Sequence, residues 1–349
     1  MDPSQARTAT LPVLATLALA LCLCPVRTAG EIGRTAGISP NDLAVVINTD
    51  DPLSVQIGEY YAGHRHVPET NIARVHFGFR RALMPAREFT ALKAAVDAQL
   101  PASIQAYALT WVRPYRVDCM SITSAFAFGF DDRYCANGCV TTELSRYYNS
   151  DSRRPFDDLQ MRPAMLLAAT SVTEARSLID RGLASDGTAP RGTAYLLTSG
   201  DAARDVRASG YGDAQMLAGD RIAIQRLDAA SISARRDVMF YFIGAVSVPE
   251  LDSNTFLPGS IGDHLTSYGG ALTEGSQMSS LRWLEAGAAG SYGTVVEPCN
   301  ITAKFPNPGL LMRRYLSGET LIESYWKSVA MPGQGLFIGE PLAAPYRAH

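Results

Sequence analysis

Short apolar runs alternate along this chain with segments in which apolar residues recur every three or four positions. The run Leu43–Ile47 has the length of a buried strand. Asp51 and Pro52, which follow it, are typical of a helix start, and apolar residues at helical spacing continue as far as His64. This opening therefore predicts a strand followed by a helix.

The same alternation extends over most of the chain. Further strands are predicted at 72–77, 105–112, 164–169, 193–198, 221–227, 238–243, 256–264, 288–296 and 336–338. Helices are predicted at 89–100, 171–187, 202–207, 276–285, 307–318 and from Thr320 onward. Because strands that alternate with helices call for a parallel sheet, the expected fold class is α/β, with a mainly parallel sheet flanked by helices in a single domain over residues 31–349.

One long segment, Arg113–Pro163, lacks any such periodicity. It contains three of the four cysteines that follow residue 30, and it leaves from the end of the strand predicted to finish at Val112. Long irregular segments in compact domains are usually functional loops that need cross-links to stay ordered. We therefore expect this segment to lie as a lid over the carboxyl rim of the sheet.

The N-terminus has the pattern of an export signal. Arg7 precedes an apolar run, Leu11–Cys24, and small residues follow up to Gly30. This run is shorter than the stretch of about 20 apolar residues that a membrane-spanning helix needs. Residues 1–30 are thus predicted to be a signal peptide, which implies a periplasmic or secreted protein with no stable membrane span. An uncleaved anchor and lipidation of Cys22 are the alternatives.

The remaining cysteines are Cys119, Cys135, Cys139 and Cys299. An even number in an exported protein favours disulfides. Cys135 and Cys139 lie in the loop DDRYCANGC, which can fold back on itself, so these two are predicted to pair and to leave Cys119 for Cys299. A four-cysteine zinc site is the alternative, but it needs thiolates kept reduced.

Composition narrows the class of protein. The chain has 349 residues, 47% of them hydrophobic, and a formal net charge of -3. It can bury a large core, and it shows neither the charge excess of a disordered chain nor the basic surface of a nucleic-acid-binding protein. Lysines are rare, and Lys304 and Lys327 fall in the last 50 residues. Lys304 is retained as a candidate binding residue.

The stretch Ser260–Gly270 carries the strongest chemical signal. An apolar lead-in runs into Asp263 and His264, and two hydroxyls, Thr266 and Ser267, precede a glycine pair. Of the five histidines, His264 alone has an adjacent acid and nearby hydroxyls. In open α/β sheets, ligands bind at the carboxyl ends of the strands. The competing interpretation is that Asp263 and His264 cap and brace a turn.

Polar residues follow two later strands in the same way. Glu297, Cys299 and Asn300 follow the apolar run Ala288–Val296, and Glu340 follows Leu336–Ile338. If all these strands are parallel, their ends meet at one rim. We therefore expect Glu297, Asn300 and Glu340 to join Asp263 and His264 within reach of one ligand.

Several blocks of the chain resemble a family of exported bacterial proteins of unknown function. The blocks are INTDDPLSVQIGEYYAGHRHVPETNI, GDHLTSYGG, AGAAGSYGTVVEPCN, FPNPGLL, GETLIESYWKSV and FIGEPLAAPY. That family is distantly similar to the gingipain-like cysteine peptidases, whose catalytic domain has a caspase-like α/β fold. The segment SVTEARSLIDRGLASDG is similar to the one those peptidases place before their catalytic strands.

The catalytic residues of those peptidases do not carry over. They have a His-Gly pair at the end of one strand and a cysteine at the end of the next. In this chain the first strand is followed by Gly244, Ala245 and Val246, and the next ends in Asp263 and His264. The resemblance thus implies a peptidase-like scaffold without the peptidase Cys-His dyad.

Three functions remain open. The first is a non-catalytic exported protein that binds a peptide, a glycan or a cell-surface partner. The second is a hydrolase with a rearranged site, in which Asp263 orients His264 as a base and Ser267 or Cys299 is the nucleophile. The third is metal binding by Asp263, His264 and a carboxylate such as Glu297 or Glu340. We favour the first because no complete catalytic set is present, and no motif indicates a cofactor.

Overall fold

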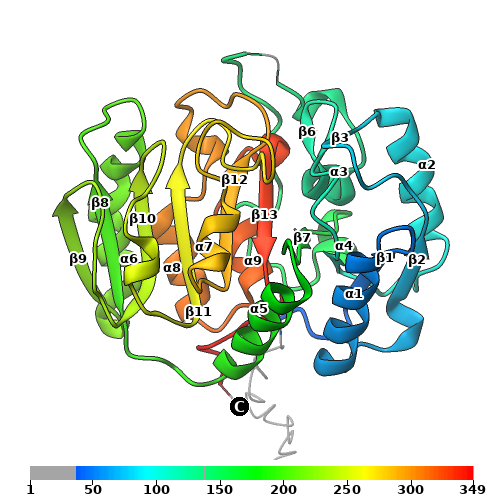
Figure 1. Cartoon of the computed structure of the whole chain (residues 1–349), viewed down its shortest axis with the longest axis horizontal. Helices are drawn as coiled ribbons and strands as arrows, with labels where there is room; N and C mark the ends of the chain where they lie inside the picture. The colour runs from blue at the N-terminus through cyan, green and yellow to red at the C-terminus, as the bar shows by residue number, and fades with distance from the viewer. Residues whose placement is uncertain (1–36, 137, 349) are drawn as a thin grey trace, which may run out of the picture. The chain divides into compact units, whose positions relative to one another are not determined.

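Nearly continuous apolar runs build the centre of the molecule. The computed structural model describes residues 37–136 and 138–348. Ten strands form one sheet in the order β2-β1-β4-β7-β13-β12-β11-β10-β8-β9 (Figure 1). The strands are β1 Leu43–Asn48, β2 Ile72–Val75, β4 Ala106–Leu109, β7 Ala164–Leu166, β8 Thr193–Thr198, β9 Ala223–Asp228, β10 Val238–Gly244, β11 Phe256–Leu265, β12 Gly290–Thr294 and β13 Gly335–Gly339.

The sheet is mainly parallel, which confirms the predicted fold class. Neighbouring strands pair in parallel except β12 and β13, which are antiparallel with Gly290 opposite Gly339 and Thr294 opposite Gly335. The prediction from the apolar runs did not include this reversal. A run of five buried residues carries no information on its direction, because side chains alternate between the faces in either case.

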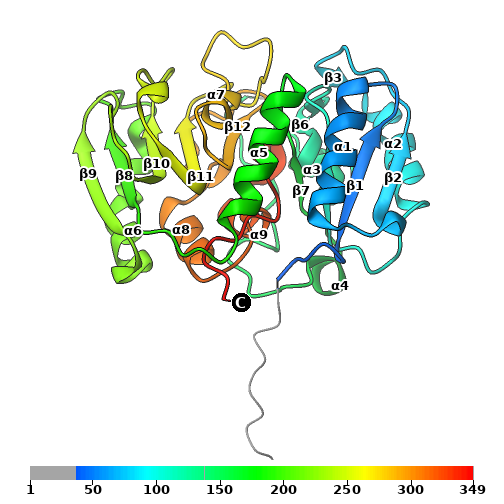
Figure 2. The same cartoon turned by 60° about the horizontal axis from the view of Figure 1, so that its bottom comes forward.

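Helices cover both faces of the sheet. They are α1 Pro52–Arg65, α2 Ala86–Asp97, α3 Ile122–Phe128, α4 Pro155–Leu159, α5 Val172–Ser185, α6 Tyr211–Ala218, α7 Leu281–Glu285, α8 Pro308–Leu316 and α9 Leu321–Trp326. Helices α1 and α5 lie side by side (Figure 2), and the Tyr60 hydroxyl of α1 donates to Asp180 of α5. The predicted caps are present: Asp51 caps α1, and Ser171 and Thr320 open capping boxes with Glu174 and Glu323.

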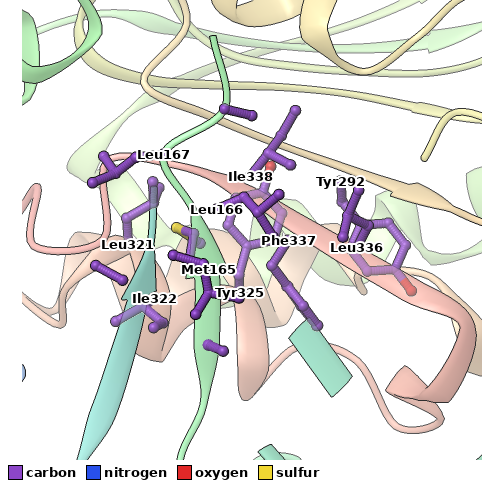
Figure 3. Packing of buried hydrophobic residues seen from close by; sticks show 14 of the residues in the cluster. Met165, Leu166, Leu167, Tyr292, Leu321, Ile322, Tyr325, Leu336, Phe337 and Ile338 are labelled. Carbon is purple, nitrogen blue, oxygen red and sulfur yellow. The ribbon is translucent and has the colours of Figure 1, made fainter. Parts of the chain in front are cut away.

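The core is continuous beneath the centre of the sheet. Phe337 of β13 stacks on Trp326 of α9, with ring centroids 4.3 Å apart. Figure 3 shows Phe337 among side chains from β7, β12 and α9, including Leu166, Tyr292 and Tyr325. Strand β13 therefore lies in the middle of the core.

The segment 113–163 is not the structureless lid that was predicted. Two short strands, β5 Arg116–Val117 and β6 Met120–Ser121, form a small sheet with β3 Leu83–Met84, and helix α3 follows directly. Nearly every residue of α3 is buried, so its sequence ITSAFAF has no polar face that would have predicted a helix. The part of the segment that covers the upper edge in Figure 1 follows α3.

Two predicted helices begin later than expected. The helix predicted at 202–207 is instead a 3-10 turn, Asp205–Gly210, that leads into α6, because Asp205 accepts hydrogen bonds from the backbone of Ser199 and Gly200. The helix predicted from Ser276 begins at Leu281 as α7. Before α7, the backbone oxygen of Met278 accepts from His264 of β11, and the Gln277 side chain accepts from Thr266 just beyond the strand.

The predicted signal peptide lies outside the described residues. Within the described part of the chain, no helix combines the length and the apolar character needed to cross a membrane.

Candidate ligand-binding site at the ends of β11 and β12

Strand β11 sets the position of Asp263 and His264. The strand continues through both residues to Leu265, so they lie inside the sheet and do not cap a turn, as the competing interpretation had it. Gly262 is required here because a Cβ at this position would lie 2.2 Å from the Trp283 ring. The indole of Trp283 therefore packs directly on the strand backbone.

Asp263 belongs to a buried ion pair. Its Oδ1 accepts a hydrogen bond of 2.5 Å from Nη1 of Arg207, and both side chains are almost fully buried. Arg207 also donates to the backbone oxygen of Ile243. Burial raises the pKa of Asp263, and the Arg207 guanidinium opposes that rise. Asp263 thus holds the 3-10 turn that contains Arg207 against β11.

His264 faces the opposite side of the sheet and has both ring nitrogens bonded. Nδ1 accepts from Nε1 of Trp283 at 2.9 Å, and Nε2 lies 3.0 Å from the backbone oxygen of Met278. Because an indole N–H can only donate, Nε2 carries the proton and donates to Met278. Burial lowers the pKa of His264 to about 4. The ring is therefore a neutral bridge between β11, α7 and the preceding loop.

Asp263 does not orient His264. Successive residues of a strand point to opposite faces, and here Asp263 contacts Arg207 whereas His264 contacts Trp283. The geometry that a triad with this acid and this base requires is absent.

A hollow lies just beyond these buried residues, where β11 and β12 end. It has a volume of about 340 Å³, and we call it the rim hollow. Its lining includes five predicted site residues: Thr266, Ser267, Glu297, Cys299 and Asn300. The remaining lining residues are Cys139, Ala203, Arg204, Leu265 and Phe305. His264 and Asp263 do not line it.

Polar groups in the rim hollow are held by their neighbours. Nη1 of Arg204 donates to Asp201 at 2.6 Å, and its Nε donates to Oγ1 of Thr266 at 3.3 Å. Oε1 of Glu297 accepts from the backbone N–H of Cys299 at 2.8 Å. Among the described residues, no partner bonds Nη2 of Arg204 or Oε2 of Glu297. The hollow therefore offers a free guanidinium donor and a free carboxylate acceptor to a ligand.

The prediction that Glu340 joins this rim is wrong. Its backbone N–H donates to the oxygen of Ala289, at the start of β12, because β13 runs antiparallel to β12. There Glu340 is fully buried and forms a bidentate pair with Arg65 of α1, which also bonds Asp186. Glu340 lies at the opposite end of the sheet from His264 and ties α1 to the core.

Lys304 lies behind the rim hollow and does not line it. Its side chain is fully buried, and no described residue bonds Nζ. Burial lowers the pKa of Lys304, and the charge of Glu297 opposes that effect. Its backbone oxygen accepts from the Tyr292 hydroxyl at 2.5 Å, which links the segment after β12 to the strand itself.

The cysteines pair differently from the prediction. Cys119 is bonded to Cys135, and Cys139 is bonded to Cys299, with Cα atoms 5.3 Å and 5.4 Å apart. Proximity in sequence is misleading here because the 3-10 turn Asp132–Tyr134 directs Cys135 back toward β6, while Cys139 faces the end of β12. The second disulfide forms part of the wall of the rim hollow.

Three residues that shape this region were not predicted from the sequence. Arg204 lines the rim hollow, Arg207 neutralises Asp263, and Trp283 holds His264. The positions of the two arginines were a usable signal, because both follow the buried strand β8 within ten residues and so lie near the end of a sheet strand. No comparable signal exists for Trp283, because its partner lies 19 residues away in the chain.

Several exposed apolar side chains belong to segments that follow the strands ending near the hollow. Among the described residues, those in the segment after α3 or directly after β10 and β11 are Val140, Leu144, Tyr148, Val246 and Tyr268.

The third hypothesis, a metal site, finds no support in this arrangement. In residues 37–136 and 138–348, no three His, Cys, Asp or Glu side chains are grouped so as to hold a metal ion. The proposed ligands are separated, since Asp263 pairs with Arg207 and Glu340 with Arg65.

Comparison with known proteins gives one structural likeness. No protein family model matches the chain, and no curated protein matches it. A solved structure described as "Structure of Protease" superposes with a TM-score of 0.51 at 10% sequence identity, over 89% of this chain and 80% of that chain. At this identity the likeness shows a shared fold, a peptidase-like α/β scaffold.

Proposed function

We propose that this protein is an exported binding protein on a peptidase-like scaffold, which holds an extended peptide in the rim hollow and does not cleave it by thiol chemistry. The observation that carries the proposal is the state of the reactive groups around the hollow. Cys299 and Cys139 are joined in a disulfide, and His264 is buried with both ring nitrogens bonded. A thiol nucleophile needs a free sulfur and a nearby base.

The groups that remain free in the hollow suit binding. Arg204 offers donors, Glu297 and Asn300 offer acceptors, and the Ser267 hydroxyl can do either. An extended peptide presents alternating N–H and C=O groups, so it can bond to donors and acceptors placed side by side. Its apolar side chains can contact the exposed Val140 and Tyr268.

The alternative of a rearranged hydrolase is less well supported. Ser267 lines the hollow, but the nearest candidate base, His264, does not. Releasing His264 as a base requires breaking its bond to Trp283 or to Met278 inside the core. A base with a pKa of about 4 also gains little driving force for proton abstraction at neutral pH.

Capture of peptides by the purified protein tests the proposal. The protein without residues 1–30 is immobilised under oxidising conditions and exposed to a displayed random peptide library. We expect enrichment of a peptide set, and at least a tenfold weaker capture of that set by Arg204→Ala and by Glu297→Gln. Arg226→Ala, on the exposed strand β9, is the matched control and should capture as the wild type does. Absence of enrichment, or equal capture by the rim variants, would contradict the proposal.

A further inference from the structure

A short piece of the upper rim is attached to the rest of the molecule mainly through one disulfide. Residues 138–144 are exposed except for the half-buried Thr142. Their backbone hydrogen bonds run from Val140 to Gly138 and from Glu143 to Arg133, both within the same loop. Apart from the Cys139–Cys299 disulfide, no side chain of this piece bonds another described residue. Hydrogen bonds to the protein body resume at Ser145, whose N–H donates to the oxygen of Ala330.

The disulfide that attaches this piece also forms the rim hollow. Cys139 and Cys299 both line the hollow, and the bond between them spans 160 residues of chain. Cys139 is exposed, so its sulfur is the more accessible of the two. The exposed Val140 directly follows Cys139 in the chain.

The other disulfide lies in a region that has further attachments. The residues around Cys119 and Cys135 belong to the small sheet, in which Val117 pairs with Met120. Tyr134 stacks on Phe128 with ring centroids 4.2 Å apart. Loss of the bond between Cys119 and Cys135 therefore leaves this region held by packing and strand pairing.

From these contacts we infer that the Cys139–Cys299 disulfide is a redox gate for the rim hollow: the oxidised protein presents a complete binding wall, and reduction by a dithiol releases residues 138–144 and weakens ligand binding. The inference rests on the proposed function, since it describes the regulation of the same site. A wall that is already ordered binds more tightly than one that must be ordered on binding.

The reaction is a thiol–disulfide exchange. One thiolate of the dithiol attacks Sγ of Cys139, a new S–S bond forms, and Cys299 leaves as a thiolate that takes up a proton. The second thiol of the dithiol then displaces Cys139 and closes the reductant into a cyclic disulfide. The protein gains two electrons and two protons, and the dithiol loses them.

Hydrogen exchange tests the release of the loop without any ligand. The variant Cys139→Ser/Cys299→Ser is compared with the oxidised wild type and with Cys119→Ser/Cys135→Ser, and thermal unfolding verifies that each is folded. We expect the amides of Val140 and Glu143, the two in this piece that donate hydrogen bonds, to exchange at least tenfold faster in the first variant and within twofold of wild type in the second. Equal exchange in all three proteins would overturn the gate.

The peptide library then separates the gate from the binding function. We expect Cys139→Ser/Cys299→Ser to capture the enriched peptides at least tenfold more weakly, as does the wild type after treatment with dithiothreitol. Undiminished capture by that variant would reject the gate and leave the binding function intact. If the oxidised wild type captures no peptide, the binding function fails, and the exchange rates alone decide whether the disulfide holds the loop.

Discussion

Removing Arg207 should destabilise the protein through the charge that it leaves behind on Asp263. In Arg207→Met the carboxylate stays fully buried, and its Oδ2 already has no partner among the described residues. Breaking a buried ion pair by removing one member costs about 3–5 kcal/mol, because the other charge is left uncompensated. The substitution also removes the hydrogen bond that Arg207 donates to the oxygen of Ile243, so we expect the loss in the free energy of unfolding to lie in the upper part of that range.

The loss of stability in Arg207→Met should be greater at high pH than at low pH. Burial already raises the pKa of Asp263, and removal of the arginine raises it further. A carboxyl group whose pKa in the folded state lies above its unfolded value binds a proton more readily when folded. Its contribution to stability is present at low pH and is lost as the pH rises through the folded-state pKa. The deficit of Arg207→Met relative to wild type should therefore be larger at pH 7.5 than at pH 4.5.

Urea unfolding followed by tryptophan fluorescence measures this deficit. The double variant Arg207→Met/Asp263→Asn removes both charges and should recover at least about 2 kcal/mol of the loss. Arg226→Met, on the exposed β9, is the control and should change the free energy of unfolding by less than about 0.5 kcal/mol. A single variant as stable as wild type, or a double variant no better than the single, would refute the role assigned to this pair.

Two further predictions concern His264 and the disulfides. The pKa of His264 is lowered to about 4 in the folded protein. Its contribution to the free energy of unfolding is therefore complete above pH 6.5, where it amounts to about 3 kcal/mol, and is lost as the pH falls toward 4. Urea unfolding of wild type and His264→Gln at pH 7.5 and pH 4.5 measures this contribution. An equal change in the free energy of unfolding between the two pH values in both proteins would contradict the prediction. Mass spectrometry without reduction should find Cys119 linked to Cys135 and Cys139 linked to Cys299. A peptide joining Cys135 to Cys139 would contradict the structure.

Much of the fold was predictable because the signals are local. The apolar runs of β1, β8 and β10 and the capping boxes of α5 and α9 each lie within a few residues of sequence. Helix α3 was missed because it is buried on nearly all sides and has no polar stripe. The direction of β13 was missed because it depends on packing against distant strands.

The candidate site was predictable in part for the same reason. Thr266, Ser267, Glu297 and Asn300 do meet in the rim hollow, because they follow neighbouring parallel strands. The sequence could not reveal that Asp263 and His264, at the end of the predicted strand, are buried against Arg207 and Trp283 and so do not reach the hollow. Pairing of Cys139 with Cys299 depends on contacts 160 residues apart, which no local pattern encodes.

The central claim is that the scaffold binds peptides without cleaving them by thiol chemistry. It is tested most directly by measuring the masses of the peptides after incubation with the protein. The oxidised protein without residues 1–30 is incubated with a peptide library, and the bound and unbound peptides are identified by mass spectrometry. The same experiment is run after treatment with a thiol alkylator and with Cys299→Ala and His264→Ala. We predict that the bound and the unbound peptides alike remain at full length in every case, whatever fraction each protein captures. Cleavage products that the alkylator abolishes, and that both substitutions remove, would contradict it.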